Sequence, residues 1–174
     1  MLEQRRSTQT PVSLTRADFD SEATGGTDTR TEVLLDDENH LVQLHISGES
    51  SDGIAVTFDP ILWPADMRPF GLDFLLKCGV DAITVRKKSE DFYQGLDRER
   101  LLTLIGPVLA RYRRRLAYGS SLGAYAVLYY GAHGFDMVIS SSPRVSVHPV
   151  HGIEHWQRKV RFRHERFDPR HPAS

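Results

Sequence analysis

The amino-acid sequence predicts an α/β fold with a mainly parallel sheet, an amino-terminal antiparallel hairpin and helices on both faces. Three observations lead to this prediction. Short apolar or alternating segments of strand length recur along the chain, amphipathic segments of helical spacing separate them, and glycines or polar turn residues stand at the junctions. Strands that alternate with helices in this way are joined by right-handed crossovers, which make neighbouring strands parallel.

The first elements are a hairpin and a buried strand. Residues 32–47 predict the hairpin, because apolar and polar residues alternate over 42–46 and an acidic turn stands at 37–39. Residues 53–58 form a short, largely apolar run that is typical of a strand buried on both faces. A proline-rich loop follows this strand.

A short helix and a third strand come next. Residues 71–80 predict the helix, which Gly79 ends, with an apolar face formed by Leu72, Leu75 and Leu76. Cys78 stands beside these leucines and is expected to be a small core residue. The β-branched segment 81–86 predicts the next strand.

The rest of the core repeats the strand and helix pattern. Residues 97–114 are amphipathic, although Gly106-Pro107 should kink or split the helix. A short strand is expected over 115–119, a helix over 121–134 and a last strand over 136–142. The sequence therefore predicts helices on both sides of one sheet.

Composition and charge exclude several classes of protein. The 174 residues carry 22 basic and 23 acidic side chains, a near-balance that argues against a dedicated nucleic-acid binder. No apolar run approaches the roughly 20 residues that span a bilayer, and the first residues contain no apolar segment of a secretory signal. The single cysteine excludes an internal disulfide. We expect a soluble cytoplasmic protein with no membrane contact.

Charge divides the chain into three parts. Residues 1–39 hold nine acidic and four basic residues, and 1–30 contain few large apolar side chains, so we expect 1–30 to be a disordered leader. Residues 31–147 are expected to form the core. Residues 148–174 are expected to form a basic, histidine-rich tail.

One motif carries chemistry. Gly119-Ser120-Ser121-Leu122-Gly123 matches G-x-S-x-G, and it stands between a predicted strand and a predicted helix. A sharp strand-to-helix turn strains its central residue and needs small flanking residues, a need that Gly119 and Gly123 meet. The Ser121 hydroxyl would then stand at the carboxyl edge of the sheet, where open α/β folds bind their ligands.

These residues make the chain resemble the α/β-hydrolase superfamily over roughly residues 32–144. It looks most like a bacterial group of poorly defined substrate, with a Trp-Pro-Ala-Asp loop at 63–66 and a Ser-Pro-Arg-Val-Ser segment at 142–146. The resemblance implies a nucleophilic serine, Ser121, and an oxyanion donor in the Leu122 N–H. It also implies an ester or related acyl substrate and no cofactor.

Two departures from the family bear on the mechanism. The usual His-Gly after the strand ending at residue 58 is replaced by Asp59-Pro60, so Ile61 N–H is the expected second oxyanion donor, because proline has no N–H. The strands that would deliver the acid and the histidine of the triad are absent, which implies a truncated hydrolase domain. A tail histidine, His148 or His151, is the expected substitute base.

Other interpretations remain beside the hydrolase. His148, His151 and His155 have spacing that invites a metal site, but Pro149 and Gly152 break any helix that would align them, so no metal is expected. The chain can instead be an inactive hydrolase-like binding module that self-associates through its last, unpaired strand. The third reading, a phosphate-binding loop, lacks the lysine of a P-loop.

Overall fold

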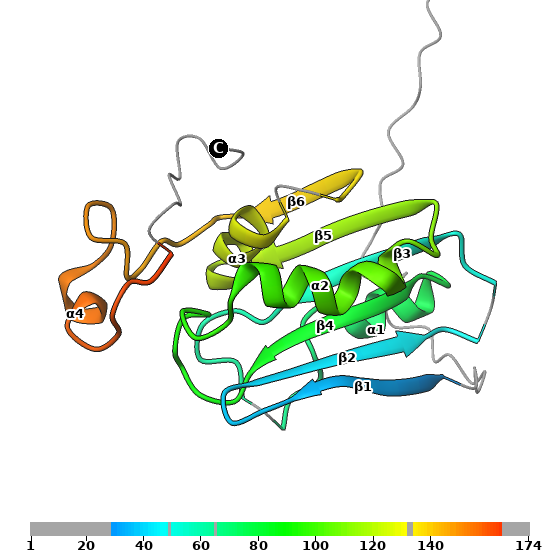
Figure 1. Cartoon of the computed structure of the whole chain (residues 1–174), viewed down its shortest axis with the longest axis horizontal. Coiled ribbons are helices and arrows are strands. Elements are labelled where there is room, and N and C mark those ends of the chain that lie inside the picture. The colour runs from blue at the N-terminus through cyan, green and yellow to red at the C-terminus, as the bar shows by residue number, and fades with distance from the viewer. Residues whose placement is uncertain (1–28, 49, 65, 132–133, 165–174) are drawn as a thin grey trace, which may run out of the picture.

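The computed structural model describes residues 29–48, 50–64, 66–131 and 134–164. Within these ranges the chain forms one six-stranded sheet in the order β1-β2-β4-β3-β5-β6, with helices packed against it (Figure 1). The strands are β1 (Arg30–Asp36), β2 (His40–Ile46), β3 (Gly53–Phe58), β4 (Asp81–Lys87), β5 (Arg114–Ser120) and β6 (Met137–Ser141). The helices are α1 (Leu72–Lys77), α2 (Arg98–Leu109), α3 (Leu122–Tyr130) and α4 (Glu154–Gln157).

The pairing of the strands confirms the predicted fold class. β1 and β2 form the antiparallel hairpin, and β2 also pairs antiparallel with β4. The pairs β4–β3, β3–β5 and β5–β6 are parallel. Because parallel strands need crossovers, α1, α2 and α3 each connect two of them.

The two faces of the sheet differ strongly in what covers them. Alternate side chains of β2, β3 and β4 point to α2 and α3 and form the main core, in which Val42, Val56 and Ile83 are fully buried. The other face carries only a small apolar cluster under α1, built on Ala55, Leu72, Leu75 and Ala82. Polar side chains of β2 and β4 occupy the rest of that face, as described below.

Two local expectations need correction. The second helix is not split at Gly106-Pro107: α2 continues through Pro107 and ends at Leu109. Pro107 removes one i→i−4 hydrogen bond, and α2 tolerates this loss without a break. Cys78 is exposed rather than in the core, since it follows α1 as its carboxyl cap, where the chain turns away from the sheet.

The residues after β6 pack against the main core. Figure 1 shows the segment that carries α4 lying beyond the carboxyl ends of the parallel strands. Val147 and His164 are buried, and Trp156 and Phe162 pack against the main core. Residues 148–164, predicted as a polar tail, therefore contribute apolar contacts. The predicted leader over 1–30 falls almost wholly outside the described residues.

Candidate functional site

The Ser121 turn stands where β5 passes directly into α3 at the carboxyl edge of the sheet. Ser121 has φ 55° and ψ −115°, a conformation that non-glycine residues rarely adopt. Its N–H donates to Ser141 O at 2.9 Å, and its carbonyl accepts from Arg144 N at 3.0 Å. These bonds hold the turn between the end of β6 and the segment that follows it.

The two glycines of the motif are required by space. A Cβ at Gly119 would lie 2.4 Å from the carbonyl oxygen of Gly123, and a Cβ at Gly123 would lie 2.2 Å from the carbonyl oxygen of Phe58. Both obstacles are backbone atoms, so neither can move aside cheaply. The spacing of the motif thus follows from the close approach of α3 to β5 and β3.

Two backbone N–H groups at this edge are unused in the described part of the chain. Neither Leu122 N–H, at the start of α3, nor Ile61 N–H, in the loop after β3, donates a hydrogen bond there. The contact of Gly123 with Phe58 brings the first turn of α3 against the beginning of that loop. Groups at a helix amino terminus favour negative charge near them.

The loop after β3 is fixed by a buried ion pair. Asp59 accepts from Arg86 Nε at 2.8 Å and from Phe70 N at 3.0 Å, and Arg86 also donates to Pro64 O at 3.0 Å. Asp59 and Arg86 are both buried. Breaking such a pair leaves a buried charge without compensation, so the loop has one well-defined position.

Lys87 fastens the same loop from β4. Its ammonium donates to Pro60 O at 2.9 Å and lies 3.7 Å from Glu90 Oε1 and 4.7 Å from the centre of the Tyr93 ring. Burial lowers the pKa of Lys87 and raises the pKa of Glu90, and their mutual attraction partly offsets both effects. Lys87 is therefore buried under the loop, and no local pattern in the sequence marks this burial.

His148 is buried in the segment after β6. Its Nδ1 accepts from Val150 N and His151 N, both at 3.1 Å, and its ring packs against Phe162 with 5.0 Å between centroids. A neutral ring that accepts at Nδ1 carries its proton on Nε2. Transfer of a proton to this ring therefore requires some of these contacts to change.

His151 differs from His148 in exposure. Its ring is exposed and stacks on His148 with 4.8 Å between centroids. In the described ranges no hydrogen bond joins the Ser121 hydroxyl to either histidine. The structure brings Ser121, Leu122 and Ile61 to one edge and leaves the two histidines on the adjoining segment.

His164 is a buried histidine that the sequence did not single out. Its Nδ1 lies 2.5 Å from Tyr125 Oη and 3.2 Å from Gln94 Nε2, and its ring stacks on Tyr129 with centroids 3.7 Å apart. Burial lowers its pKa to about 4. No local pattern marks this residue, because its partners stand on α3 and on the loop after β4.

The described residues hold neither a grouped set of metal ligands nor a membrane-spanning helix. In residues 29–164, apart from those left undescribed, no three His, Cys, Asp or Glu side chains are grouped as metal ligands would be. None of the helices described above has the length and apolarity needed to cross a bilayer.

Comparison with solved structures shows similarity of fold. The capsule O-acetyltransferase of Neisseria meningitidis serogroup A superposes with a TM-score of 0.49 at 15% identity, over 64% of this chain and 52% of its own. Brefeldin A esterase, a bacterial homologue of human hormone sensitive lipase, gives 0.47 at 12% identity, over 86% and 47%. An esterase of Pyrococcus furiosus gives 0.44 at 17% identity, over 78% and 56%.

The similarity is confined to the fold. This chain spans about half the length of each of these three chains. No family model and no curated protein matches the sequence. The strand order and pairing confirm the predicted α/β class, with a mainly parallel sheet and an amino-terminal antiparallel hairpin.

Proposed function

We propose that this chain hydrolyses an ester or related acyl bond of a small molecule with Ser121 as the nucleophile. The observation that carries the proposal is the backbone of Ser121, held at φ 55° between two glycines that no larger residue can replace without a clash. Strain of this kind at a non-glycine residue is typical of functional sites. The G-x-S-x-G spacing assigns it to a nucleophilic serine.

The proposed reaction proceeds through an acyl-serine. The Ser121 oxygen attacks the carbonyl carbon, its proton passes to a base, and the C–O bond to the alcohol breaks as that alcohol takes the proton. Water then gives a proton to the base and attacks the acyl carbon, the bond to Ser121 Oγ breaks, the carboxylic acid leaves, and the base returns the proton to the serine oxygen. The unused N–H groups of Leu122 and Ile61 would stabilise the negative charge on the carbonyl oxygen in both steps.

We propose His151 as the base and His148 as the residue that positions it. The His151 ring is exposed, whereas His148 Nδ1 already accepts the backbone N–H of His151. Arg144, which donates its N–H to the Ser121 carbonyl, stands only a few residues before this turn. The base then acts once substrate closes the segment over Ser121, since hydrogen bonds to a base often form only in the complex.

The test is hydrolysis of p-nitrophenyl butyrate by the purified chain. Ser121→Ala should lower kcat/KM about 10³-fold or more, while Ser120→Ala, the matched change at the preceding residue, should leave it within a few-fold. His151→Ala should lower it about 10²-fold. Equal activity of wild type and Ser121→Ala would refute the nucleophile, and full activity of His151→Ala would refute the base.

A second candidate function is supported by β6. This edge strand exposes Met137, Val138 and Ile139 at 41–60% of their surface, and paired edges of this kind join chains. An inactive hydrolase-like module would then self-associate along β6. Light scattering of wild type and Ile139→Lys tests it: a dimer that becomes a monomer in the variant supports this function, and a wild-type monomer rejects it.

A further inference from the structure

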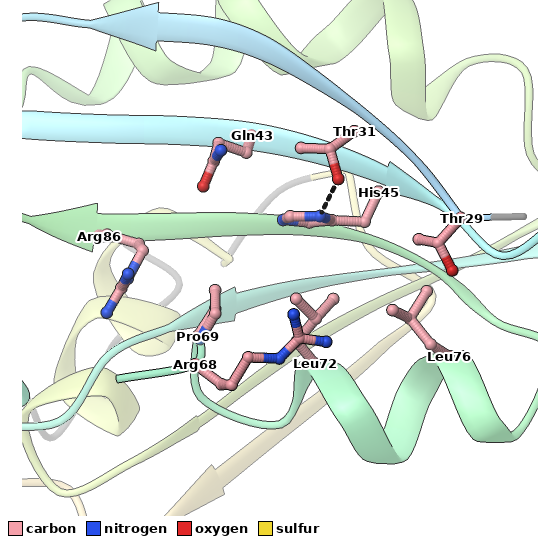
Figure 2. Close-up of a pocket in the computed structure, with 9 residues that line it drawn as sticks. All are labelled: Thr29, Thr31, Gln43, His45, Arg68, Pro69, Leu72, Leu76 and Arg86. Atoms are coloured by element: carbon pink, nitrogen blue, oxygen red, sulfur yellow. Dashed lines mark hydrogen bonds between the residues drawn. The ribbon is translucent and has the colours of Figure 1, made fainter. Parts of the chain in front are cut away.

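A cavity of about 350 Å³ lies on the α1 face of the sheet, away from the Ser121 turn. Its walls come from β1, β2, β4, α1 and the loop before α1, and none of residues 119–123 lines it (Figure 2). Helix α1 covers only part of this face, and the cavity lies over the polar part that it leaves open. Ligand binding at this cavity is independent of the proposed hydrolase function.

The inner wall is formed by uncharged side chains that hydrogen bonds join to one another. His45 Nδ1 lies 3.0 Å from Thr31 Oγ1, and His45 Nε2 lies 3.0 Å from Thr84 Oγ1. Burial first, and then the charges of Arg68 and Arg86, lower the pKa of His45 to about 4. The ring is therefore neutral near pH 7 and already satisfied at both nitrogens.

Each charged side chain that lines the cavity is an arginine already paired with a carboxylate outside the lining. Arg68 and Arg86 are the ionised residues of its lining, and within the described chain no Asp or Glu joins them there. Arg86 is buried and bonded to Asp59, so it supplies charge from the wall. Arg68 is largely exposed at the opening and bonds Asp73 on its outer side through Nε and Nη2.

One further donor is in place. Figure 2 shows the side chain of Gln43 on β2 and the guanidinium of Arg68 directed into the space between β2 and α1. Among the described residues the Gln43 amide has no hydrogen-bond partner, although it lines the cavity. An amide and a guanidinium that line the same cavity suit an oxygen anion.

The opposite wall is apolar. Pro69, Leu72 and Leu76 form it, and Leu72 is buried. An inorganic anion would leave this wall unused, whereas a small organic acid would place its carbon chain there and its carboxylate toward Arg68 and Gln43.

We propose that this cavity binds a small aliphatic carboxylate, with Arg68 and Gln43 holding its oxygens. The volume suits a ligand of this size, and the guanidinium of Arg68 keeps N–H groups beyond the Nε and Nη2 bonds to Asp73 that can donate to its carboxylate. Hexanoate is the probe for the class, hexanol is the uncharged control, and inorganic phosphate tests an anion without a carbon chain.

The experiment follows the ring signals of the histidines by NMR during titration of the full chain with each probe. Hexanoate should shift the His45 signal saturably and leave His148, which stands in the segment after β6 and does not line the cavity, unchanged. Arg68→Gln should weaken binding at least about tenfold, because it removes a charge-assisted hydrogen bond. Arg114→Gln, which removes an equally exposed charge at the far edge, should not weaken it.

Several results would overturn the assignment. It fails if hexanoate does not shift His45, if Arg68→Gln and Arg114→Gln bind it equally well, or if hexanol binds as tightly as hexanoate. Binding of phosphate in place of hexanoate refutes the carboxylate. Since Arg68 is exposed, the Arg68→Gln variant should fold, and an unchanged far-UV spectrum checks this.

Discussion

The Ser121 turn and the histidine-bearing segment over 142–164 adjoin one another, but they are held in place by different means. The turn is fixed by the close approach of backbone atoms, which leaves no room for a side chain at Gly119 or Gly123. The segment is held by side-chain packing against loops and helices far away in sequence, as at His164 and Trp156. Steric contacts of the backbone therefore hold the Ser121 turn, whereas the position of the histidine-bearing segment depends on side-chain packing.

The largest difference should appear when a methyl group is added to the turn. Gly123→Ala places a Cβ against Phe58 O, so we expect a loss of about 3 kcal/mol or more in the free energy of unfolding. Gly106→Ala is the matched control. It lies inside α2 with nothing within 4 Å of the added Cβ, and it should gain up to about 1 kcal/mol.

Urea denaturation of both variants measures this difference. Equal stability of Gly123→Ala and wild type would show that α3 and β3 can separate at no cost. The turn would then be no more rigid than the segment beside it.

Acid should act on the segment instead. Because the pKa of His164 is about 4 in the folded chain and near 6.5 unfolded, the unfolded chain takes up a proton first as the pH falls. Stability is therefore complete above pH 6.5 and declines toward pH 4, by about 3 kcal/mol for this residue. His164→Phe keeps a ring on Tyr129 and should flatten the decline.

The measurement is the free energy of unfolding of wild type and His164→Phe at several pH values between 4 and 7. His45, whose pKa is also about 4, adds a decline of the same sign in both proteins. Parallel curves for the two proteins would mean that His164 does not resist protonation.

The smallest expected effects are on stability, and they distinguish His151, the proposed base, from His148, which is proposed to position it. His148→Ala leaves two backbone N–H groups without an acceptor and should cost about 1–2 kcal/mol. His151→Ala removes an exposed ring and should change stability by less than about 0.5 kcal/mol. Thermal unfolding compares them, and equal losses would contradict the distinction drawn between these rings.

Local patterns predicted most of the fold. We could predict the hairpin, the buried strand at 53–58 and the parallel strands from the sequence. Alternation, apolar runs and glycines are patterns that extend over only a few residues. The G-x-S-x-G motif is local as well, although Gly123 is required by Phe58 O, which only the fold brings beside it.

Long-range contacts could not be predicted in the same way. No local pattern distinguishes Lys87 from an exposed lysine. The parallel pairing of β3 with β4 places its ammonium 2.9 Å from Pro60 O. His164 and Gln94 are 70 residues apart, and no periodicity links them. Burial of a polar side chain depends on which helices, strands and loops pack against it. Local patterns in the sequence do not indicate this packing.

Activation of Ser121 is the central claim, and covalent labelling by a fluorophosphonate probe tests it most directly. The purified chain should take up one probe, located by mass spectrometry on Ser121, and Ser121→Ala should take up none while Ser120→Ala labels as wild type does. Absence of labelling in a folded wild-type sample, or labelling that persists in Ser121→Ala, would contradict the claim.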